Sequence, residues 1–178
     1  MSLDRTLSPP NGSAPVIRAA LPGDCDDVAL MATELAHATA PGVHPKVTGD
    51  ALRANLFGPA PLLRLVVAER QGELLGYCLS LLMFSTWHGA RGLHVIDLYV
   101  RPGLRGDKLG ERLLAAAARS AWREGARFIR LEVERGNANA ERFYARLGFV
   151  LKDNERHYTI AHEPMRLLTE RAGLTTGD

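Results

Sequence analysis

The clearest alternation of apolar and polar positions lies in residues 93–123, which predict a strand, a turn and a helix in that order. The stretch His94–Val100 is rich in β-branched and aromatic residues and ends near a Pro-Gly pair, where proline lacks the N–H that a ladder needs. From Leu109 onwards, apolar residues recur every three or four positions while charged residues take the other face. This spacing is typical of an amphipathic helix. The residues between the strand and this helix contain glycines and are expected to form a turn.

The remaining apolar runs predict further elements on both sides of this stretch. Strands are expected at residues 16–20, 62–69, 74–84, 128–133, 149–152 and 157–160. Helices are expected from Asp24 or Asp26 to before Pro41, at 48–57 with Thr48 or Asp50 as a cap, from Asn139 to Gly148, and at 165–172. Residues 1–14 and 173–178 have little to bury and are expected to be a flexible leader and tail, so residues 15–172 are interpreted as a single domain.

Composition narrows the classes of function. The 178 residues hold 22 Lys and Arg against 20 Asp and Glu, and a net charge of +2 argues against a protein that binds nucleic acid by bulk electrostatics. No run of 18 apolar residues and no signal-like leader occurs, so no membrane partner is expected and the protein is interpreted as cytoplasmic. Cys25 and Cys78 stand far apart without metal-ligand spacing, which predicts structural thiols and no metal site.

The turn is basic, because Arg101, Arg105, Lys108 and Arg112 fall within residues 101–112. The first N–H groups of a helix lack internal partners and lie at the positive end of its dipole, so a glycine-containing turn into a helix can bind a phosphate. The pattern is not a P-loop, because no G-x-x-x-x-G-K-[ST] occurs. The turn therefore suits a polyanionic cofactor.

This segment resembles motif A of the GCN5-related N-acetyltransferase (GNAT) family, a strand ending in Val followed by R/Q-x-x-G-x-G/A. The matching residues are Val100, Arg105 and Gly110, and Lys108 stands at the first glycine of the pattern. In that family the turn binds the pyrophosphate of acetyl-CoA, and the strand end binds pantetheine and presents backbone donors to the acetyl carbonyl. The resemblance therefore implies acetyl-CoA as co-substrate, bound by Leu98, Tyr99, Val100, Arg105, Gly106, Asp107, Lys108, Leu109 and Gly110.

A second resemblance lies downstream, where residues 137–149 match the family's motif B, N-x-x-A-x-x-F-Y-x-x-x-G-F, at every specified position. It implies that Asn137, Ala140 and Phe143 contact the cofactor and that Tyr144 protonates the coenzyme sulfur as it leaves. A phenol and a thiol ionise in a similar range, so this transfer is well matched. The resemblance implies the α/β (α+β) GNAT fold, with a mixed, mostly antiparallel central sheet of six to seven strands flanked by about four helices.

Neither motif identifies the group that accepts the proton of the attacking amine. Counting back from Val100 by twos places His94 and Asp97 on opposite faces of the strand, although a bulge would alter the count locally. His94 takes the position where histone-type relatives carry a catalytic glutamate, and Asp97 is the alternative. Glu132 and Glu134 are weaker candidates for the same role.

Three interpretations of the function remain open. Residues 95–100 are similar to the sequence L-E-D-F-F-V of the spermidine/spermine (diamine) acetyltransferase-like branch, with Ile96 at the glutamate and Asp97 kept. This favours direct attack on the thioester by a small-molecule amine such as a diamine, polyamine, amino acid or amino-bearing drug, bound by loops 37–50 and 85–92. The alternatives are a protein or peptide N-acetyltransferase and a non-catalytic coenzyme-A-binding sensor or scaffold. A homodimer is the family-level expectation.

Overall fold

The computed structural model describes residues 14–104, 108–156 and 158–171. Of the predicted leader only residue 14 is described, and the predicted tail lies outside the described residues. By its internal contacts the chain divides into two compact units, Met1–Asn137 and Ala138–Asp178. In the described part of the chain no helix has the length and hydropathy needed to cross a membrane.

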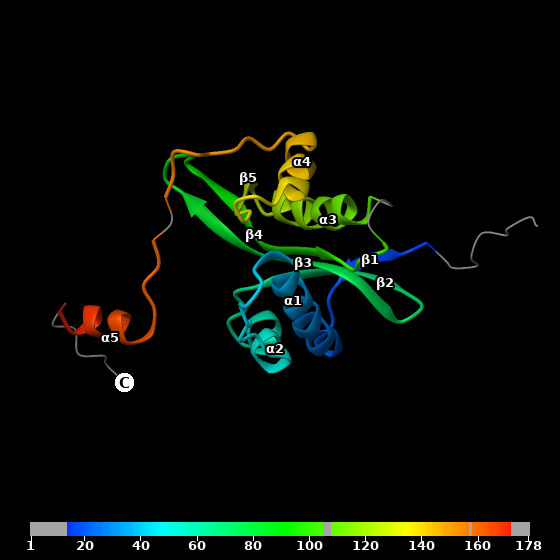
Figure 1. Cartoon of the computed structure of the whole chain (residues 1–178), viewed down its shortest axis with the longest axis horizontal. Helices are drawn as coiled ribbons and strands as arrows, with labels where there is room; N and C mark the ends of the chain where they lie inside the picture. The colour runs from blue at the N-terminus through cyan, green and yellow to red at the C-terminus, as the bar shows by residue number, and fades with distance from the viewer. Residues whose placement is uncertain (1–13, 105–107, 157, 172–178) are drawn as a thin grey trace, which may run out of the picture. The chain divides into compact units, whose positions relative to one another are not determined.

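The first unit is built on one mixed sheet of five strands, whose order in space is also their order in the sequence (Figure 1). Neighbouring strands are antiparallel except for the last pair, which is parallel. The strands are β1 (Val16–Ala19), β2 (Arg64–Arg70), β3 (Glu73–Ser85), β4 (Ala90–Val100) and β5 (Ala126–Leu131). The predicted class and the mostly antiparallel sheet are confirmed, but the described residues form five strands where six to seven were expected.

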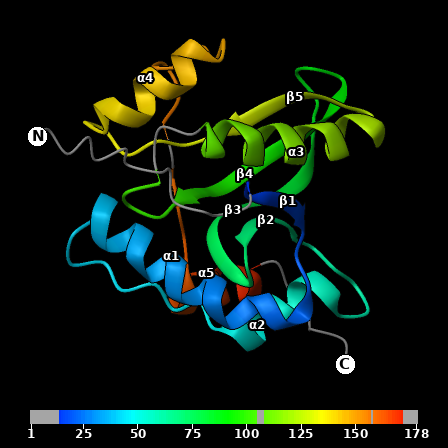
Figure 2. The ribbon, with the colours of Figure 1, turned by 90° about the vertical axis from the view of Figure 1, so that its right-hand side faces the viewer.

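Helices cover both faces of this sheet (Figures 1 and 2). A short 3₁₀ turn, η1 (Pro22–Asp24), leads into α1 (Cys25–Thr39), which packs with α2 (Gly49–Phe57) on one face. The helix α3 (Leu109–Arg123) packs on the other face, against β2, β3 and β4. This helix is the crossover that a parallel pair of strands requires, because the chain must return to the same end of the sheet before β5 begins.

The predicted patterns explain the packing on both faces. Met31 and Tyr77 are fully buried between α1 and the sheet, and the apolar stripe of α3 is buried around Leu113. Thr48 caps α2 as predicted, since its Oγ1 accepts a hydrogen bond from the N–H of Ala51 at 3.1 Å. The first unit thus forms a single core on each face of one sheet.

The second unit contains α4 (Ala138–Arg146) and α5 (His162–Arg171). The helix α4 begins before Asn139, so the predicted cap is wrong, and the Asn139 side-chain oxygen instead accepts a hydrogen bond from Arg142 at 2.6 Å. The predicted stop at Gly148 is confirmed. This residue has a φ of +90°, and the N–H of Phe149 donates to the carbonyl of Tyr144 at 3.1 Å, which closes the helix end.

Two predicted strands near the C-terminus are wrong. No strand forms at residues 149–152 or at the described residues 158–160, and His157 lies outside the described residues. Val150, Leu151 and Tyr158 are 78%, 81% and 86% exposed, so their apolar surface is not packed. A strand is stable only where a neighbouring strand accepts its hydrogen bonds, and no ladder is formed by these described residues.

Candidate active site

A bulge in β4 sets the geometry of the candidate site. The ladder between β3 and β4 pairs Leu79 with Asp97 and Ser80 with Val95. Ile96 is therefore skipped, and two residues of β4 advance where β3 advances by one. Such an extra residue shifts the alternation of side chains by one position, so every residue before Ile96 changes face relative to a regular strand.

The shift brings two candidate bases to one face of the sheet. Asp97 pairs with Leu79, and His94 pairs with Leu81. Leu79 and Leu81 are two residues apart on β3 and point to the same side, which is the side of α1. His94 and Asp97 therefore share a face, and the regular count that separated them is wrong because it omits the bulge.

The carboxylate of Asp97 accepts a hydrogen bond from a tyrosine of the neighbouring strand. The hydroxyl of Tyr77 donates to Oδ2 of Asp97 at 3.2 Å. Burial raises the pKa of the Asp97 carboxyl above its usual range, and the Tyr77 hydrogen bond acts in the opposite direction. Burial and the neighbouring carboxylate raise the pKa of Tyr77 well above that of a free phenol, so its hydroxyl stays protonated and remains a donor.

Asp97 and Tyr77 lie in the wall of a cleft of about 470 Å³. The cleft is bounded by α1, α2, the loop before α2, and the middle of β3 and β4. It is lined by Val28, Ala32, Leu35, Ala36, Thr39, Ala40, Pro45, Lys46, Val47, Leu52, Leu63, Tyr77, Leu79, Ile96 and Asp97. Among these lining residues Asp97 is the only carboxylate and Lys46 the only cation, so a mainly apolar space contains one charge of each sign.

A second tyrosine, Tyr99, connects α1 and β4 through a hydrogen bond beside the cleft. The hydroxyl of Tyr99 donates to Oε2 of Glu34 at 2.7 Å, and the rings of Tyr77 and Tyr99 lie 6.1 Å apart. Glu34 belongs to α1 and Tyr99 to β4, so this bond joins the helix that walls the cleft to the strand that carries Asp97.

His94 lies on the same face but has a different neighbourhood. Its Nε2 is 3.5 Å from Oε2 of Glu132, whose other oxygen is 3.4 Å from Nε of Arg130. His94 and Glu132 do not line the cleft that contains Asp97. Glu134 is exposed, and its carbonyl accepts the N–H of Asn137 at 3.0 Å, which makes it part of a turn.

The end of β4 runs beyond its parallel neighbour. The ladder with β5 ends at the pair of Val95 with Leu131, whereas β4 continues to Val100. On its other side this segment stays paired with β3, where Val100 lies opposite Gly76. A Cβ on Gly76 would come within 2.4 Å of the carbonyl oxygen of Tyr99, so the close approach of the two strands requires glycine there.

The basic turn ends in a residue with a left-handed backbone. Lys108 precedes α3 with φ 55° and ψ 19°, and Leu109 and Gly110 form the first turn of that helix. Arg105, Gly106 and Asp107 lie outside the described residues. The backbone at Lys108 explains why the resembling pattern has glycine at this position, because a left-handed conformation costs free energy for residues that carry a Cβ.

Replacing Lys108 by Gly is expected to raise the free energy of unfolding by about 1 kcal/mol, because the left-handed conformation is then unstrained. Denaturant unfolding monitored by circular dichroism measures the change. Lys108→Ala is the matched control, since it removes the same charge and keeps the strain. Equal stabilities for the two variants would contradict the explanation.

The motif B residues lie at the junction and in the second unit. Asn137 is the last residue of the first unit, and Ala140, Phe143 and Tyr144 belong to α4. The Tyr144 ring packs edge-on against Phe143 and Phe149, with centroids 5.1 Å and 5.4 Å apart. Within this unit the tyrosine is thus held by aromatic neighbours on both sides.

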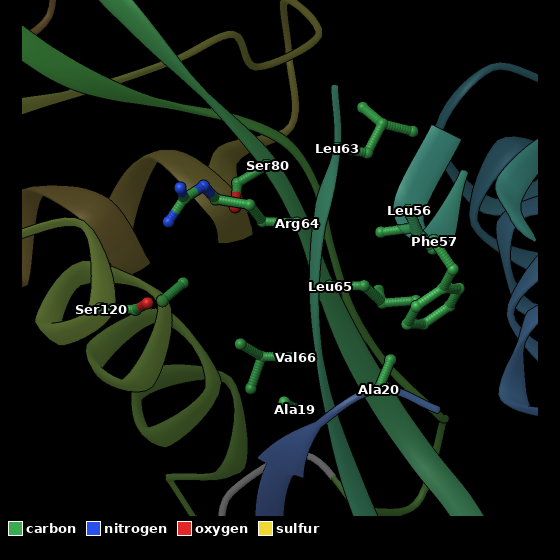
Figure 3. Close-up of a pocket in the computed structure, with 11 residues that line it drawn as sticks. Ala19, Ala20, Leu56, Phe57, Leu63, Arg64, Leu65, Val66, Ser80 and Ser120 are labelled. Carbon is green, nitrogen blue, oxygen red and sulfur yellow. The ribbon is translucent and has the colours of Figure 1, made fainter. Parts of the chain in front are cut away.

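A smaller cavity of about 230 Å³ lies where β1 leaves the edge of β2 (Figure 3). Ser120 of α3 and Arg64 lie on one side of β2, and Leu56 and Phe57 of α2 lie on the other (Figure 3). Arg64 is ion-paired with Glu124, and none of the residues lining the cavity carries a carboxylate. This cavity therefore offers no group that could accept a proton from an ammonium ion.

Sequence reasoning missed Tyr77 and Glu34 as parts of the site, whereas Lys46 lies in the loop 37–50 that was expected to bind the acceptor. Tyr77 is the only hydroxyl-bearing residue between Leu74 and Leu79, and a polar tip inside an otherwise apolar stretch is the signal that could have identified it. Glu34 carries no such signal, because a charged residue on a surface helix is ordinary.

Residues 30–149 match the model of the acetyltransferase (GNAT) family. The chain is 35% identical over 141 residues to a thialysine N-epsilon-acetyltransferase from Sus scrofa, with 75% of this chain and 82% of the relative covered. An integron cassette protein from V. cholerae superposes with a TM-score of 0.72 at 19% identity, covering 89% of this chain and 99% of that one. An aminoglycoside N-acetyltransferase in complex with CoA superposes with a TM-score of 0.65 at 20% identity, covering 88% and 99%. At these identities the two structures show likeness of fold.

Proposed function

We propose that this chain, which belongs to the acetyltransferase (GNAT) family and is an acetyltransferase, transfers the acetyl group of acetyl-CoA to a primary amine of a small molecule. The observation that carries the proposal is the Asp97 carboxylate, which lies in the wall of a mainly apolar cleft. A carboxylate in such a place attracts an ammonium ion and can accept its proton.

Acetyl-CoA supplies the activated acetyl group as a thioester. Two features of this structure fit it: the end of β4 that runs beyond its ladder with β5, and the start of α3 after the left-handed Lys108. Within the proposal, Leu98, Tyr99 and Val100 bind pantetheine through their backbone groups, and Lys108, Leu109 and Gly110 present N–H groups to the pyrophosphate. Arg105, Gly106, Asp107, Asn137, Ala140 and Phe143 complete the proposed binding set.

The proposal assigns two acid–base roles, one to Asp97 because it lies in the cleft and one to Tyr144 because α4 resembles motif B. Asp97 takes a proton from the acceptor ammonium, the amine nitrogen forms a bond to the acetyl carbon and loses its second proton to solvent, and the carbon–sulfur bond breaks; solvent returns a proton to Tyr144 after it has protonated the sulfur. The raised pKa of Asp97 makes it a better proton acceptor near neutral pH than an exposed carboxylate. Tyr144 gives a proton to the departing sulfur, and His94 is the alternative base beside Glu132.

The charges of the cleft support an acceptor with one amine and an apolar body. Asp97 can hold one ammonium, but a second ammonium of a polyamine would find no further carboxylate among the lining residues and would meet Lys46. An anionic far end would instead be attracted by Lys46. The relative named as a thialysine N-epsilon-acetyltransferase supports a small-molecule acceptor whose amine is acetylated at the end of a side chain.

Length-matched acceptors test the proposal. We expect release of CoA from acetyl-CoA with 5-aminopentanoate, pentylamine and 1,5-diaminopentane to fall in that order, by about tenfold from the first to the last. Short peptides with a free N-terminus serve as the comparison for a protein acceptor. Turnover of peptides alone would contradict a small-molecule acceptor. A preference for the diamine would contradict an acceptor whose end opposite the reacting amine is anionic and lies near Lys46.

The assembly and location of the enzyme belong to the same proposal. We expect a homodimer, as the resemblance to the family implies. From the composition and the sequence pattern we expect it to work in the cytoplasm on a small-molecule substrate without nucleic acid, membrane or metal partners. Size-exclusion chromatography with light scattering measures the assembly directly, and a monomer that retains full activity would contradict it.

A further inference from the structure

The buried side chain of Tyr77 forms a hydrogen bond to Asp97, the candidate base. Tyr77 is 0% exposed, and its hydroxyl donates to Oδ2 of Asp97 at 3.2 Å. Both residues line the cleft, so the hydrogen bond lies in its wall. A buried ring has few rotamers, and its hydroxyl is therefore fixed in position.

We infer that Tyr77 is a positioning residue, which holds the Asp97 carboxylate ionised and oriented toward the cleft so that an incoming ammonium meets a charged acceptor. The inference rests on the proposed function in one respect, that Asp97 is the group which meets the ammonium. The hydrogen bond itself is independent of that role, since it joins two residues of β3 and β4 within one unit.

A carboxylate in this position needs such a donor because its surroundings disfavour charge. Most residues lining the cleft are apolar, and burial raises the pKa of Asp97. No ion pair to Asp97 occurs among the described residues. A hydrogen bond to the charged form stabilises that form, so Tyr77 offsets part of the effect of burial.

The other titratable groups around Asp97 do not supply the same contact. On β4 and α1, Tyr99 and Glu34 bond to each other, and His94 lies beside Glu132. On β3 the thiol of Cys78 is buried, and burial together with the charge of Asp97 raises its pKa to about 12, so it stays neutral.

Other titratable groups lie on α1, on α2 and in the loop between them, where the rings of His37 and His44 pack against each other with centroids 6.0 Å apart. On α2, Asp50 is ion-paired with Arg53, which also contacts Asp26. Lys46 lines the cleft from the loop and is exposed. Tyr77 is therefore the group with a hydrogen bond to Asp97 in this neighbourhood.

Tyr99 provides a matched control within the same wall. Its ring lies 6.1 Å from that of Tyr77 and is 3% exposed, but its hydroxyl donates to Glu34 instead of Asp97. Tyr77→Phe and Tyr99→Phe each remove one hydroxyl and keep the ring, so both variants preserve the packing of the core. They differ in whether Asp97 loses its donor.

The pH dependence of kcat/KM with 5-aminopentanoate separates the two variants. For Tyr77→Phe we expect kcat/KM to fall about tenfold at pH 6 and to stay within about twofold of the wild type at pH 9, because Asp97 then binds its proton more tightly. For Tyr99→Phe we expect the shape of the profile to be unchanged. Identical profile shapes for wild type and Tyr77→Phe would overturn the inference.

A second readout does not depend on activity. Carbon-13 NMR of labelled aspartate carboxyls, assigned with Asp97→Asn, follows the protonation of Asp97 in the full chain. We expect its titration midpoint to move to higher pH in Tyr77→Phe and to stay in place in Tyr99→Phe. An unmoved midpoint overturns the role of Tyr77. If the titration midpoint of Asp97 shifts in Tyr77→Phe but the wild-type protein acetylates no amine, the proposed function is wrong, while the effect of Tyr77 on the ionisation of Asp97 still holds.

Discussion

Replacement of Asp97 by Asn is expected to lower kcat/KM for amine acceptors by about 100-fold to 1000-fold, because the variant keeps the shape of the side chain and loses the proton acceptor. The amide also cannot attract an ammonium into a cleft whose other lining charge is Lys46. Cofactor binding uses other residues in the proposal. Steady-state kinetics measures the loss, and isothermal titration should give a dissociation constant for CoA within about twofold of the wild type.

Two controls make the Asp97 result specific. Glu132→Gln removes a carboxylate on the same face that lies beside His94 and does not line the cleft, so its kcat/KM should stay within about threefold of the wild type. His94→Gln tests the alternative base directly. If Asp97→Asn were nearly as active as the wild type while His94→Gln lost activity, the base would be His94 and the proposed geometry of proton transfer would be wrong.

The elements of the first unit could be predicted because each leaves a local pattern. The helix α3 has an apolar stripe, and Thr48 precedes α2 as a cap, so one element at a time could be placed without tertiary knowledge. The strands near residues 149–160 were predicted by the same apolar signal and do not form. Their failure has a physical reason, since a helix satisfies its own hydrogen bonds and a strand needs a neighbour.

The geometry of the site depends on the register between β3 and β4, which cannot be predicted from the sequence of either strand alone. The bulge at Ile96 is a mismatch in register between β3 and β4, and it alone decides that His94 and Asp97 share a face. The hydrogen bond from Tyr77 to Asp97 depends on the same pairing. Motif comparison could therefore identify Asp97 as a candidate, whereas its donor and its cleft required the folded sheet.

Lys108 shows the opposite relation between sequence and structure. In the sequence it is a departure from a glycine pattern, with no indication of what the departure does. In the structure the same residue has a positive φ, which explains the glycine of the pattern as a backbone requirement. The turn can thus keep its shape with lysine at a cost in stability, and it gains a cation where the pyrophosphate is proposed to bind.

Tyr144 is expected to contribute through its hydroxyl alone. Tyr144→Phe should lower kcat by about 100-fold and leave the dissociation constant of CoA within about twofold, because the departing sulfur then lacks its proton donor. The ring contacts with Phe143 and Phe149 are kept in this variant, so α4 should retain its fold. Steady-state and single-turnover kinetics with the best acceptor measure the effect on the chemical step.

A tyrosine elsewhere in the same unit gives the matched control for this result. Tyr158 is 86% exposed, and Tyr158→Phe removes a hydroxyl of the same kind without an expected change in kcat. A better leaving group sharpens the test, since the sulfur needs its proton least when the thiolate leaves readily. An acyl donor whose thiol is more acidic than that of CoA should therefore restore much of the rate of Tyr144→Phe. Equal loss of rate with both donors would show that the hydroxyl acts on something other than the leaving sulfur.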